Sequence, residues 1–226
     1  MLLITAATKY EIEHITKGLS LEQGVITPLK PGVSLLVTGV GAVPTAFYLT
    51  KMLANEPKLS VVNIGVAGAY ARDVELGSVV IVQRDTFADY GADDKGSFLS
   101  QFDLGLANPN TFPYQNGWMY WKHQDLFSVA DKFQRVAGIT LAKASGSEAE
   151  ISQLIERYSP QVETMECASV FYTCLLMNVP FVCIRSISNW VEPRNKERWN
   201  LPLAVANLCS VAEEFIDCYS QNLHNR

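Results

Sequence analysis

Two glutamates occupy positions at which α/β enzymes place reactive side chains. Glu11 comes soon after residues 2–7, an apolar run that predicts a buried strand, and Glu166 opens a strongly apolar run that predicts a helix. Ligands of open α/β sheets usually bind beyond the carboxyl ends of the strands, so Glu11 is placed to accept a proton from water. Glu166 has two interpretations: it contacts a ligand, or it stabilises its helix by about 0.3 to 1 kcal/mol as a negative charge at the N-terminus.

A third group of polar side chains comes at the end of another predicted strand. Residues 181–186 run into Arg185-Ser-Ile-Ser-Asn189, which supplies a guanidinium, two hydroxyls and an amide. Polar groups that converge at such an edge indicate a binding site rather than packing. Because these groups and the two glutamates come from distant parts of the sequence, they predict one small-molecule site.

Two glycine-rich segments follow predicted strands. Thr38-Gly-Val-Gly-Ala-Val-Pro44 opens a predicted helix as a dinucleotide-binding turn does, but Pro44 replaces the third glycine of that motif. The next strand also has Asn63 where a ribose-binding carboxylate would be needed, so we expect no cofactor. Gly65-Val-Ala-Gly68 predicts either a tight turn or a close approach of the backbone to a ligand.

The cysteines and histidines do not predict a metal site. The cysteines are an odd number with no C-x-x-C spacing, so we expect them to be reduced and buried. The histidines are scattered, and we expect no zinc site. These residues are Cys167, Cys174, Cys183, Cys209 and Cys218, and His14, His123 and His224.

The order of apolar runs predicts an α/β fold, because strand-length runs alternate with helix-length periodic stretches. The early strands are apolar at consecutive positions, as expected when helices cover both faces of a mostly parallel sheet. We therefore expect a three-layer α/β/α sandwich with a mixed, mostly parallel central sheet. The expected strands are 2–7, 34–38, 61–66, 79–82, 136–142 and 181–186; the expected helices start near Lys9 and cover 43–54, 148–157, 166–177 and the region from Leu201, which Asn200 would cap.

One segment, residues 88–124, breaks this alternation with frequent glycine, proline and aromatic residues. We expect it to be loop. Long insertions of this kind often act as a lid or an interface arm, and the alternative is a flap that only covers the core. With no linker or repeat elsewhere, residues 1–226 are expected to form a single domain with this insertion.

The charge and the apolar runs limit the partners. Eighteen Lys and Arg against 23 Asp and Glu give a net charge of −5, which argues against binding to nucleic acid or to an anionic membrane. No apolar run approaches the roughly 18 residues that a membrane helix needs. Met1-Leu-Leu-Ile lacks the basic start of a signal peptide, so we expect a cytoplasmic protein.

Several of these segments together resemble one family. The opening strand and acidic turn, the two glycine segments and the two polar segments resemble the nucleoside phosphorylase and nucleosidase superfamily, and within it the methylthioadenosine/adenosylhomocysteine nucleosidases. The segments are Ile4-Thr-Ala-Ala-Thr-Lys-Tyr-Glu-Ile12, Thr38-Gly-Val-Gly-Ala42, Asn63-Ile-Gly-Val-Ala-Gly68, Leu76-Gly-Ser-Val-Val80, Thr164-Met-Glu-Cys-Ala168, Val179-Pro-Phe-Val182 and Arg185-Ser-Ile-Ser188.

A departure from that pattern bears on the substrate. The methylthioadenosine enzymes carry an Asp that protonates N7 of adenine, whereas this chain has Asn189 followed by Trp-Val-Glu-Pro-Arg-Asn195 and then by Trp199-Asn-Leu-Pro202. These segments of the sequence resemble the futalosine hydrolase family, which releases hypoxanthine and dehypoxanthinyl futalosine in the alternative menaquinone pathway. An amide can donate to the O6 and N7 acceptors of a 6-oxopurine while its own oxygen accepts. Asn189 therefore favours hypoxanthine over adenine, and the proton for N7 would come from water or a tautomer.

The resemblance also implies roles for the site residues. Glu11 would activate water, and Glu166 would bind the ribose hydroxyls and stabilise an oxocarbenium-like sugar. Val66 stands where phosphorylases hold phosphate with a serine, which favours hydrolysis over phosphorolysis. Arg185 would fix one of the glutamates or form a structural ion pair. The other implied substrate contacts are Met165 at the ribose and Gly68, Ser145, Gly146 and Ser188 near the purine.

The tail of the substrate, Cys167, the oligomeric state and the exact function each allow further expectations or alternatives. Residues 87–102 and Arg194 are candidates for the benzoate-bearing tail of futalosine, and Cys167 either packs or narrows the pocket. The resemblance implies a homodimer or higher homo-oligomer, because this family commonly borrows lid residues from a neighbour. The alternatives are another purine nucleosidase or phosphorylase, with an inosine-like or methylthioadenosine substrate, and a protein that binds a nucleoside without cleaving it.

Overall fold

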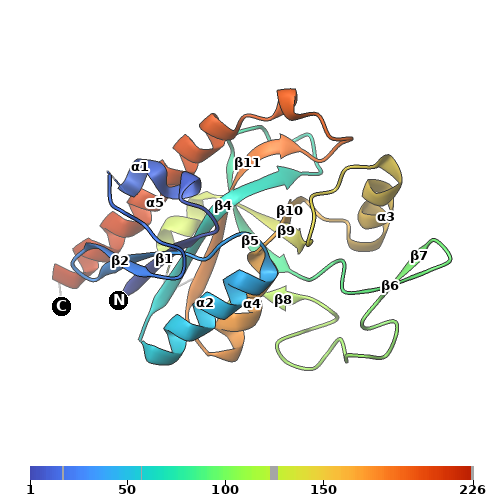
Figure 1. The fold of residues 1–226 in the computed structure, drawn as a ribbon, viewed down its shortest axis with the longest axis horizontal. Coiled ribbons are helices and arrows are strands. Elements are labelled where there is room, and N and C mark those ends of the chain that lie inside the picture. The colour runs from blue at the N-terminus through green and yellow to red at the C-terminus, as the bar shows by residue number, and fades with distance from the viewer. Residues whose placement is uncertain (17, 57, 123–126, 225–226) are drawn as a thin grey trace.

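The computed structural model describes residues 1–16, 18–56, 58–122 and 127–224 (Figure 1). His123 and Gln124, which belong to two of the predictions above, lie outside these residues, as does the side chain of His224. The strands are β1 (Leu2–Ala6), β2 (Ile26–Lys30), β3 (Val33–Val37), β4 (Ser60–Ala69), β5 (Val79–Asp85), β6 (Gly91–Asp94), β7 (Ser97–Ser100), β8 (Met119–Tyr120), β9 (Gln134–Thr140), β10 (Val162–Thr164) and β11 (Phe181–Trp190). The helices are α1 (Glu13–Thr16), α2 (Ala42–Asn55), α3 (Glu148–Tyr158), α4 (Cys167–Leu176) and α5 (Leu201–His224), with 3₁₀ turns at Tyr10–Ile12, Ser128–Lys132 and Lys196–Arg198.

The strands form a mixed sheet in the order β10-β9-β5-β11-β4-β1-β3-β2, with β8 on β5. β4 pairs in parallel with both β1 and β11, and β9 pairs in parallel with β5 and β10. β10 also pairs antiparallel with the far end of β4, so five strands close into a ring. The predicted α/β class with a mixed, mostly parallel sheet is confirmed, and the ring is a feature that the sequence pattern did not predict.

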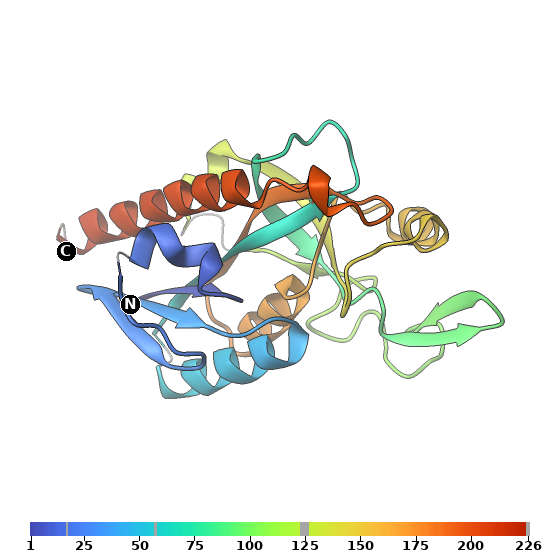
Figure 2. The same ribbon diagram turned by 45° about the horizontal axis from the view of Figure 1, so that its top comes forward.

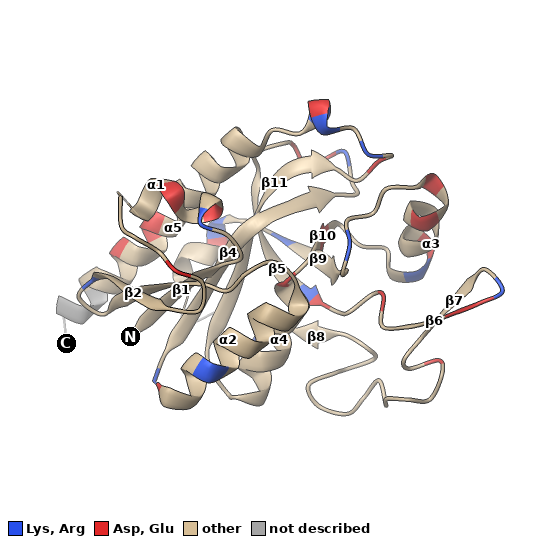
Figure 3. Ribbon diagram, in the orientation of Figure 1, with Lys and Arg blue, Asp and Glu red and all other residues tan. Residues whose placement is uncertain are grey.

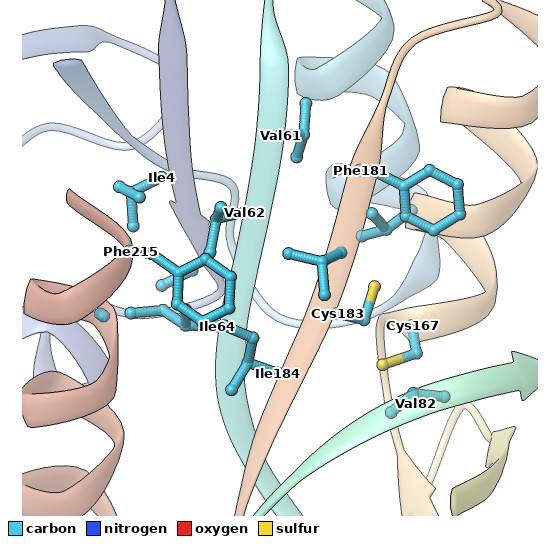
Figure 4. Packing of buried hydrophobic residues seen from close by; sticks show 14 of the residues in the cluster. Ile4, Val61, Val62, Ile64, Val82, Cys167, Phe181, Cys183, Ile184 and Phe215 are labelled. Atoms are coloured by element: carbon cyan, nitrogen blue, oxygen red, sulfur yellow. The ribbon is translucent and has the colours of Figure 1, made fainter. Parts of the chain in front are cut away.

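Helices cover both faces of this sheet. α2 and α4 lie together on one face, and α1 and α5 lie on the other (Figures 1 and 2). In Figure 4, Ile64 and Ile184 lie on the side of Phe215 from α5, whereas Phe181 and Cys183 lie on the side of Cys167 from α4. Each central strand therefore buries side chains on both faces, which explains why its apolar residues are consecutive.

Several predictions about strands are wrong: β2 and β10 were missed, and β4, β5 and β11 are longer than expected. β2 was missed because Pro28 cannot donate a ladder hydrogen bond, and it lies at the edge of the sheet, where proline is tolerated. Gly65 to Gly68 form no turn but continue β4, and β11 likewise extends past Ser186 to Trp190. These extensions pair with each other, and this places their polar ends at one edge of the sheet.

The prediction that residues 88–124 are all loop is also wrong. β6 and β7 form a hairpin that projects from the body of the fold (Figure 1), and β8 pairs with β5. The hairpin turn holds Lys95 and Gly96 at φ of 56° and 88°, as a two-residue turn of right-handed strands requires. Asp-Lys-Gly was the local signal for this turn.

The remaining predictions differ in outcome. The helix expected near Lys9 is a 3₁₀ turn followed by the one-turn α1. Asn200 caps α5, because its side-chain oxygen accepts from the Leu203 N–H at 3.2 Å. None of the five cysteines forms a disulfide with a described residue; four of them are buried and Cys218 is partly buried. Among the described residues, no helix is both long and apolar enough to cross a membrane.

Candidate active site

A cavity of about 270 Å³ lies at the carboxyl ends of β1, β4, β10 and β11. This is the edge at which the sequence predicted a site. The cavity brings together eight of the ten predicted site residues: Glu11, Val66, Gly68, Ser145, Met165, Glu166, Ser188 and Asn189.

Glu11 is a buried carboxylate whose position is fixed by three donors. Its Oε2 accepts from the backbone N–H and the hydroxyl of Thr8 at 2.8 and 2.9 Å, and its Oε1 accepts from the Val66 N–H at 3.2 Å. A carboxylate offers about four acceptor positions, so one position is left for a water molecule or a ligand. Gly65 makes room for it, because a Cβ there would lie 3.0 Å from Glu11 Oε1.

Glu166 is the N-cap residue of α4, and its carboxylate points away from its own helix. Its Oε1 accepts from the Gly41 N–H at 2.8 Å. Gly41 has φ of 96°, which explains the glycine in the Thr38–Ala42 turn: the turn presents a backbone donor to Glu166 rather than a phosphate site. Burial raises the pKa of Glu166, and the nearby Arg185 guanidinium and the Gly41 hydrogen bond oppose that rise.

Asn189 enters the cavity because β11 has a bulge. Ile187 pairs with Ala67 and Asn189 pairs with Gly68, so Ser188 is an extra residue in β11. The Ser188 hydroxyl donates to Asn189 Oδ1 at 2.8 Å, and Asn189 Nδ2 donates to the Trp190 carbonyl at 3.0 Å. A carbonyl can only accept, so these two contacts fix which end of the amide is the donor.

Glu163 is a cavity residue to which the sequence analysis gave no role. Its Oε1 accepts from the Ser145 N–H at 3.0 Å, and its Oε2 accepts from the Tyr70 hydroxyl at 2.7 Å. Burial and the charge of Glu163 raise the pKa of Tyr70, which therefore stays a neutral donor. Glu163 thus holds the loop of Ser145 against the cavity, and β10, with three residues, is too short to have given a signal for it in the sequence.

Two predicted site residues lie outside the cavity. Arg185 is buried beneath it and donates to Asn63 Oδ1 at 2.7 Å and to the Ile184 carbonyl at 2.8 Å. The expected hydrogen bond from Arg185 to either glutamate is not formed among the described residues, so it acts on them through its charge. Gly146 is exposed and does not line the cavity, and Cys167 is buried in the core beside Cys183, which favours packing as its role.

The charges around the cavity are mainly negative. Its described lining holds four carboxylates, Glu11, Glu163, Glu166 and Glu192, and one cation, Arg194. Glu192 is paired with Arg72 at 2.7 Å and with Arg198 at 3.3 Å. Arg194 lies over the Trp199 ring at 5.2 Å and forms no ion pair with a described residue. The cavity therefore disfavours inorganic phosphate in its interior and offers one free cation near its opening.

Two of the larger cavities are lined by none of the ten predicted site residues. One, of about 710 Å³, lies between the β6–β7 hairpin and α3. The other, of about 620 Å³, lies between α2, α4 and the insertion, and its lining includes Phe87, Tyr90, Phe112 and Tyr172. Phe87 and Tyr90 therefore line a different cavity from that of Glu11, and contact between residues 87–102 and a substrate tail stays a prediction.

The sequence matches the model of the Phosphorylase superfamily over residues 3–217. The chain belongs to this superfamily. Among curated relatives it is 28% identical to futalosine hydrolase of Thermus thermophilus, over 82% of this chain and 81% of that one. It is 30% identical to 5′-methylthioadenosine/S-adenosylhomocysteine nucleosidase of Haemophilus ducreyi, over 83% and 81%.

Solved structures of this superfamily share the fold. The native structure of futalosine hydrolase of Helicobacter pylori has a TM-score of 0.75 at 18% identity, over 96% of this chain and 97% of that one. The Helicobacter pylori methylthioadenosine nucleosidase with butyl-thio-DADMe-Immucillin-A has the same score and coverage. The protein is a nucleosidase, an N-glycosidase of the phosphorylase superfamily.

Proposed function

We propose that this nucleosidase acts on purine nucleosides and hydrolyses futalosine, releasing hypoxanthine and dehypoxanthinyl futalosine. The observation that carries the proposal is the oriented amide of Asn189 in the cavity of Glu11 and Glu166. The free N–H of that amide can donate to O6 or N7 of a 6-oxopurine, and its oxygen keeps a lone pair for N1–H or a water. Relatives named futalosine hydrolase in two bacteria support this substrate.

The two glutamates have separate roles in the proposed reaction. Glu11 takes a proton from water as the water oxygen forms a bond to C1′, and the C1′–N9 bond breaks with its electron pair going to the purine. Glu166 accepts from the 2′- and 3′-hydroxyls, and its charge stabilises the positive sugar. Met165 lines the ribose. The leaving purine receives its proton at N7 from a second water, and Glu11 returns the proton that it took to the resulting hydroxide, which restores the carboxylate.

Hydrolysis rather than phosphorolysis follows from the charges. The cavity interior presents carboxylates, and Val66 contributes only its N–H, which already binds Glu11. A phosphate dianion would meet repulsion from these carboxylates, and Arg185, the buried cation beneath the cavity, does not line it and donates to Asn63 Oδ1 and the Ile184 carbonyl instead.

The test measures hypoxanthine or adenine release from futalosine, inosine and methylthioadenosine in parallel, with and without phosphate. Rapid, phosphate-independent cleavage of futalosine supports the proposal. Preferred cleavage of methylthioadenosine would contradict hypoxanthine as the purine base that the site selects, and dependence of the rate on phosphate would contradict hydrolysis. Tight binding with no released base would identify a nucleoside-binding protein.

The tail of futalosine is expected to leave the cavity beside Trp199 and Arg194. The cavity of about 270 Å³ is smaller than the roughly 300 to 1,000 Å³ of sites that enclose a drug-sized ligand, so a long 5′ substituent extends through the opening. The unpaired Arg194 is the cation nearest that route, and the tail ends in a carboxylate.

Replacing Arg194 by Gln should therefore raise KM for futalosine about fivefold, since an exposed ion pair contributes about 1 kcal/mol at most. KM for inosine, which lacks the tail, should not change. Arg198→Gln is the matched control, because Arg198 is committed to Glu192 and does not line the cavity. An equal change in KM for futalosine and for inosine would show that Arg194 does not bind the tail.

We also propose that the protein forms a homodimer through α2 and α4. Both helices are nearly free of charged residues (Figure 3); α2 exposes Val43 and Phe47 at 76% and 60%, and α4 exposes Tyr172 and Leu176. Leu106 and Phe112 of the insertion are also exposed, so the apolar area continues onto that segment. Large exposed apolar areas of this kind mark interfaces.

Phe47→Glu should convert the protein to a monomer, because a carboxylate would be buried without a partner at the centre of this apolar area. Light scattering coupled to gel filtration measures the mass directly. Ile155→Glu, an exposed apolar position on α3, is the control and should keep the mass of the unmodified protein. A monomeric unmodified protein would contradict the proposal.

A further inference from the structure

The first turn of α4 has an unusual arrangement of caps. An N-cap side chain normally accepts from the free N–H groups of its own helix. Glu166 holds the N-cap position, but its carboxylate turns into the cavity and accepts from Gly41 instead. The first N–H groups of α4, those of Cys167 and Ala168, therefore need other acceptors, since unpaired N–H groups are costly when buried.

Two threonines from neighbouring strands supply those acceptors. Thr164, at the end of β10, accepts from the Cys167 N–H at 3.2 Å, and Thr140, at the end of β9, accepts from the Ala168 N–H at 2.8 Å. The two residues pair in register, and their hydroxyl oxygens are 3.1 Å apart. The cap of α4 is thus built by the sheet rather than by the helix.

Asp85, the last residue of β5, ends this chain of hydrogen bonds. The Thr140 hydroxyl donates to Asp85 Oδ1 at 2.8 Å, so the Thr164 hydroxyl is free to donate to Thr140. Both threonine oxygens then keep lone pairs for the helix N–H groups. Asp85 is fully buried, burial raises its pKa well above the usual range, and its Oδ2 has no hydrogen-bond partner in the part of the chain that the structure describes.

The cost of burying that carboxyl calls for a role other than filling space. Gly138 adapts to it, because a Cβ at Gly138 would lie 2.5 Å from Asp85 Oδ2. Thr140 is the only side chain that hydrogen-bonds to Asp85 among the described residues, and this contact leads to the turn that carries Glu166.

We propose that Asp85 and Thr140 are positioning residues that hold the first turn of α4, so that the Glu166 carboxylate is free of capping and fixed in the cavity. The inference rests on the proposed role of Glu166. Asp85 orients the Thr140 hydroxyl, the threonines bind the helix N–H groups, and the helix start presents Glu166 to the ribose.

A pair of substitutions at Thr140 separates positioning from stability. Thr140→Val removes the hydroxyl and keeps the shape, and it should lower kcat about tenfold with little change in KM, because small displacements of a reacting group have large effects on rate. Thr140→Ser keeps the hydroxyl and removes a buried methyl, so it should lose thermal stability and keep kcat. Asp85→Asn keeps an oxygen that can accept from Thr140 and should also keep most of kcat.

Thr173→Val is the matched control, since Thr173 is buried on the same helix and its hydroxyl takes no part in the hydrogen bonds that link Asp85 to Thr140 and Thr164. It should leave kcat unchanged. Equal kcat values for the Val and Ser variants at position 140 would overturn the inference.

A crystal structure of the Thr140→Val variant adds a readout besides activity. The inference expects loss of the 2.8 Å contact between Glu166 Oε1 and the Gly41 N–H, and an unmoved Glu166 would overturn it. If Glu166→Gln has no effect on kcat, the proposed role of Glu166 fails, and the structure still decides whether Thr140 positions it. If Glu166→Gln lowers kcat and Thr140→Val does not, only the positioning inference fails.

Discussion

Glu11→Gln is expected to lower kcat for futalosine by about 10² to 10⁴, the usual contribution of a general base. The amide cannot take the proton of the attacking water. It also fits poorly, because one of its ends must place an NH₂ group against the Thr8 or the Val66 N–H, which now donate to the two carboxylate oxygens. The measurement is the single-turnover rate at saturating futalosine, which separates the chemical step from product release.

Glu163→Gln is the matched control for this substitution. Glu163 is another carboxylate of the same cavity, but the Tyr70 hydroxyl that it contacts can accept as well as donate. A glutamine there can accept from the Ser145 N–H and donate to Tyr70, so its effect on kcat should be less than about tenfold. Similar losses in the two variants would show that the loss in Glu11→Gln reflects disturbed packing rather than a missing base.

The sequence was sufficient to predict features that depend only on residues close together in the chain. Glu11 and Glu166 lie at the expected edge of the sheet because each follows or begins a strongly apolar element, and the cap at Asn200 was predicted because cap residues have a local signature. The alternation of strands and helices, likewise a local pattern, was sufficient for the fold class.

The features that were missed depend on contacts between distant segments. The antiparallel pairing of β10 with β4 closes the ring, and β10 has only three residues, too few for a periodic signal. Arg185 could be assigned to the site region but not to Asn63, because the sequence does not state which strand lies beside β11. The bulge at Ser188 is likewise a property of the pairing between β11 and β4.

Asn189→Asp tests most directly whether the site selects hypoxanthine as the purine base. The amide now donates to the Trp190 carbonyl, and an ionised carboxylate in its place would lose that hydrogen bond and would repel O6 of hypoxanthine. It would accept from the 6-amino group of adenine, and when protonated it could donate to N7. Two changed hydrogen bonds at about 1.5 kcal/mol each predict a change of about 10²-fold in substrate preference.

The sharpest measurement compares kcat/KM for futalosine and for its 6-amino analogue, which carries the same tail. We expect the unmodified protein to prefer futalosine and the Asn189→Asp variant to shift toward the amino compound. Ser188→Ala is the control: it removes the hydroxyl that orients the amide but leaves the same groups facing the base. It should therefore lower kcat/KM for both compounds without changing their ratio. An unchanged ratio in Asn189→Asp would mean that backbone groups of the cavity, rather than this side chain, select the purine.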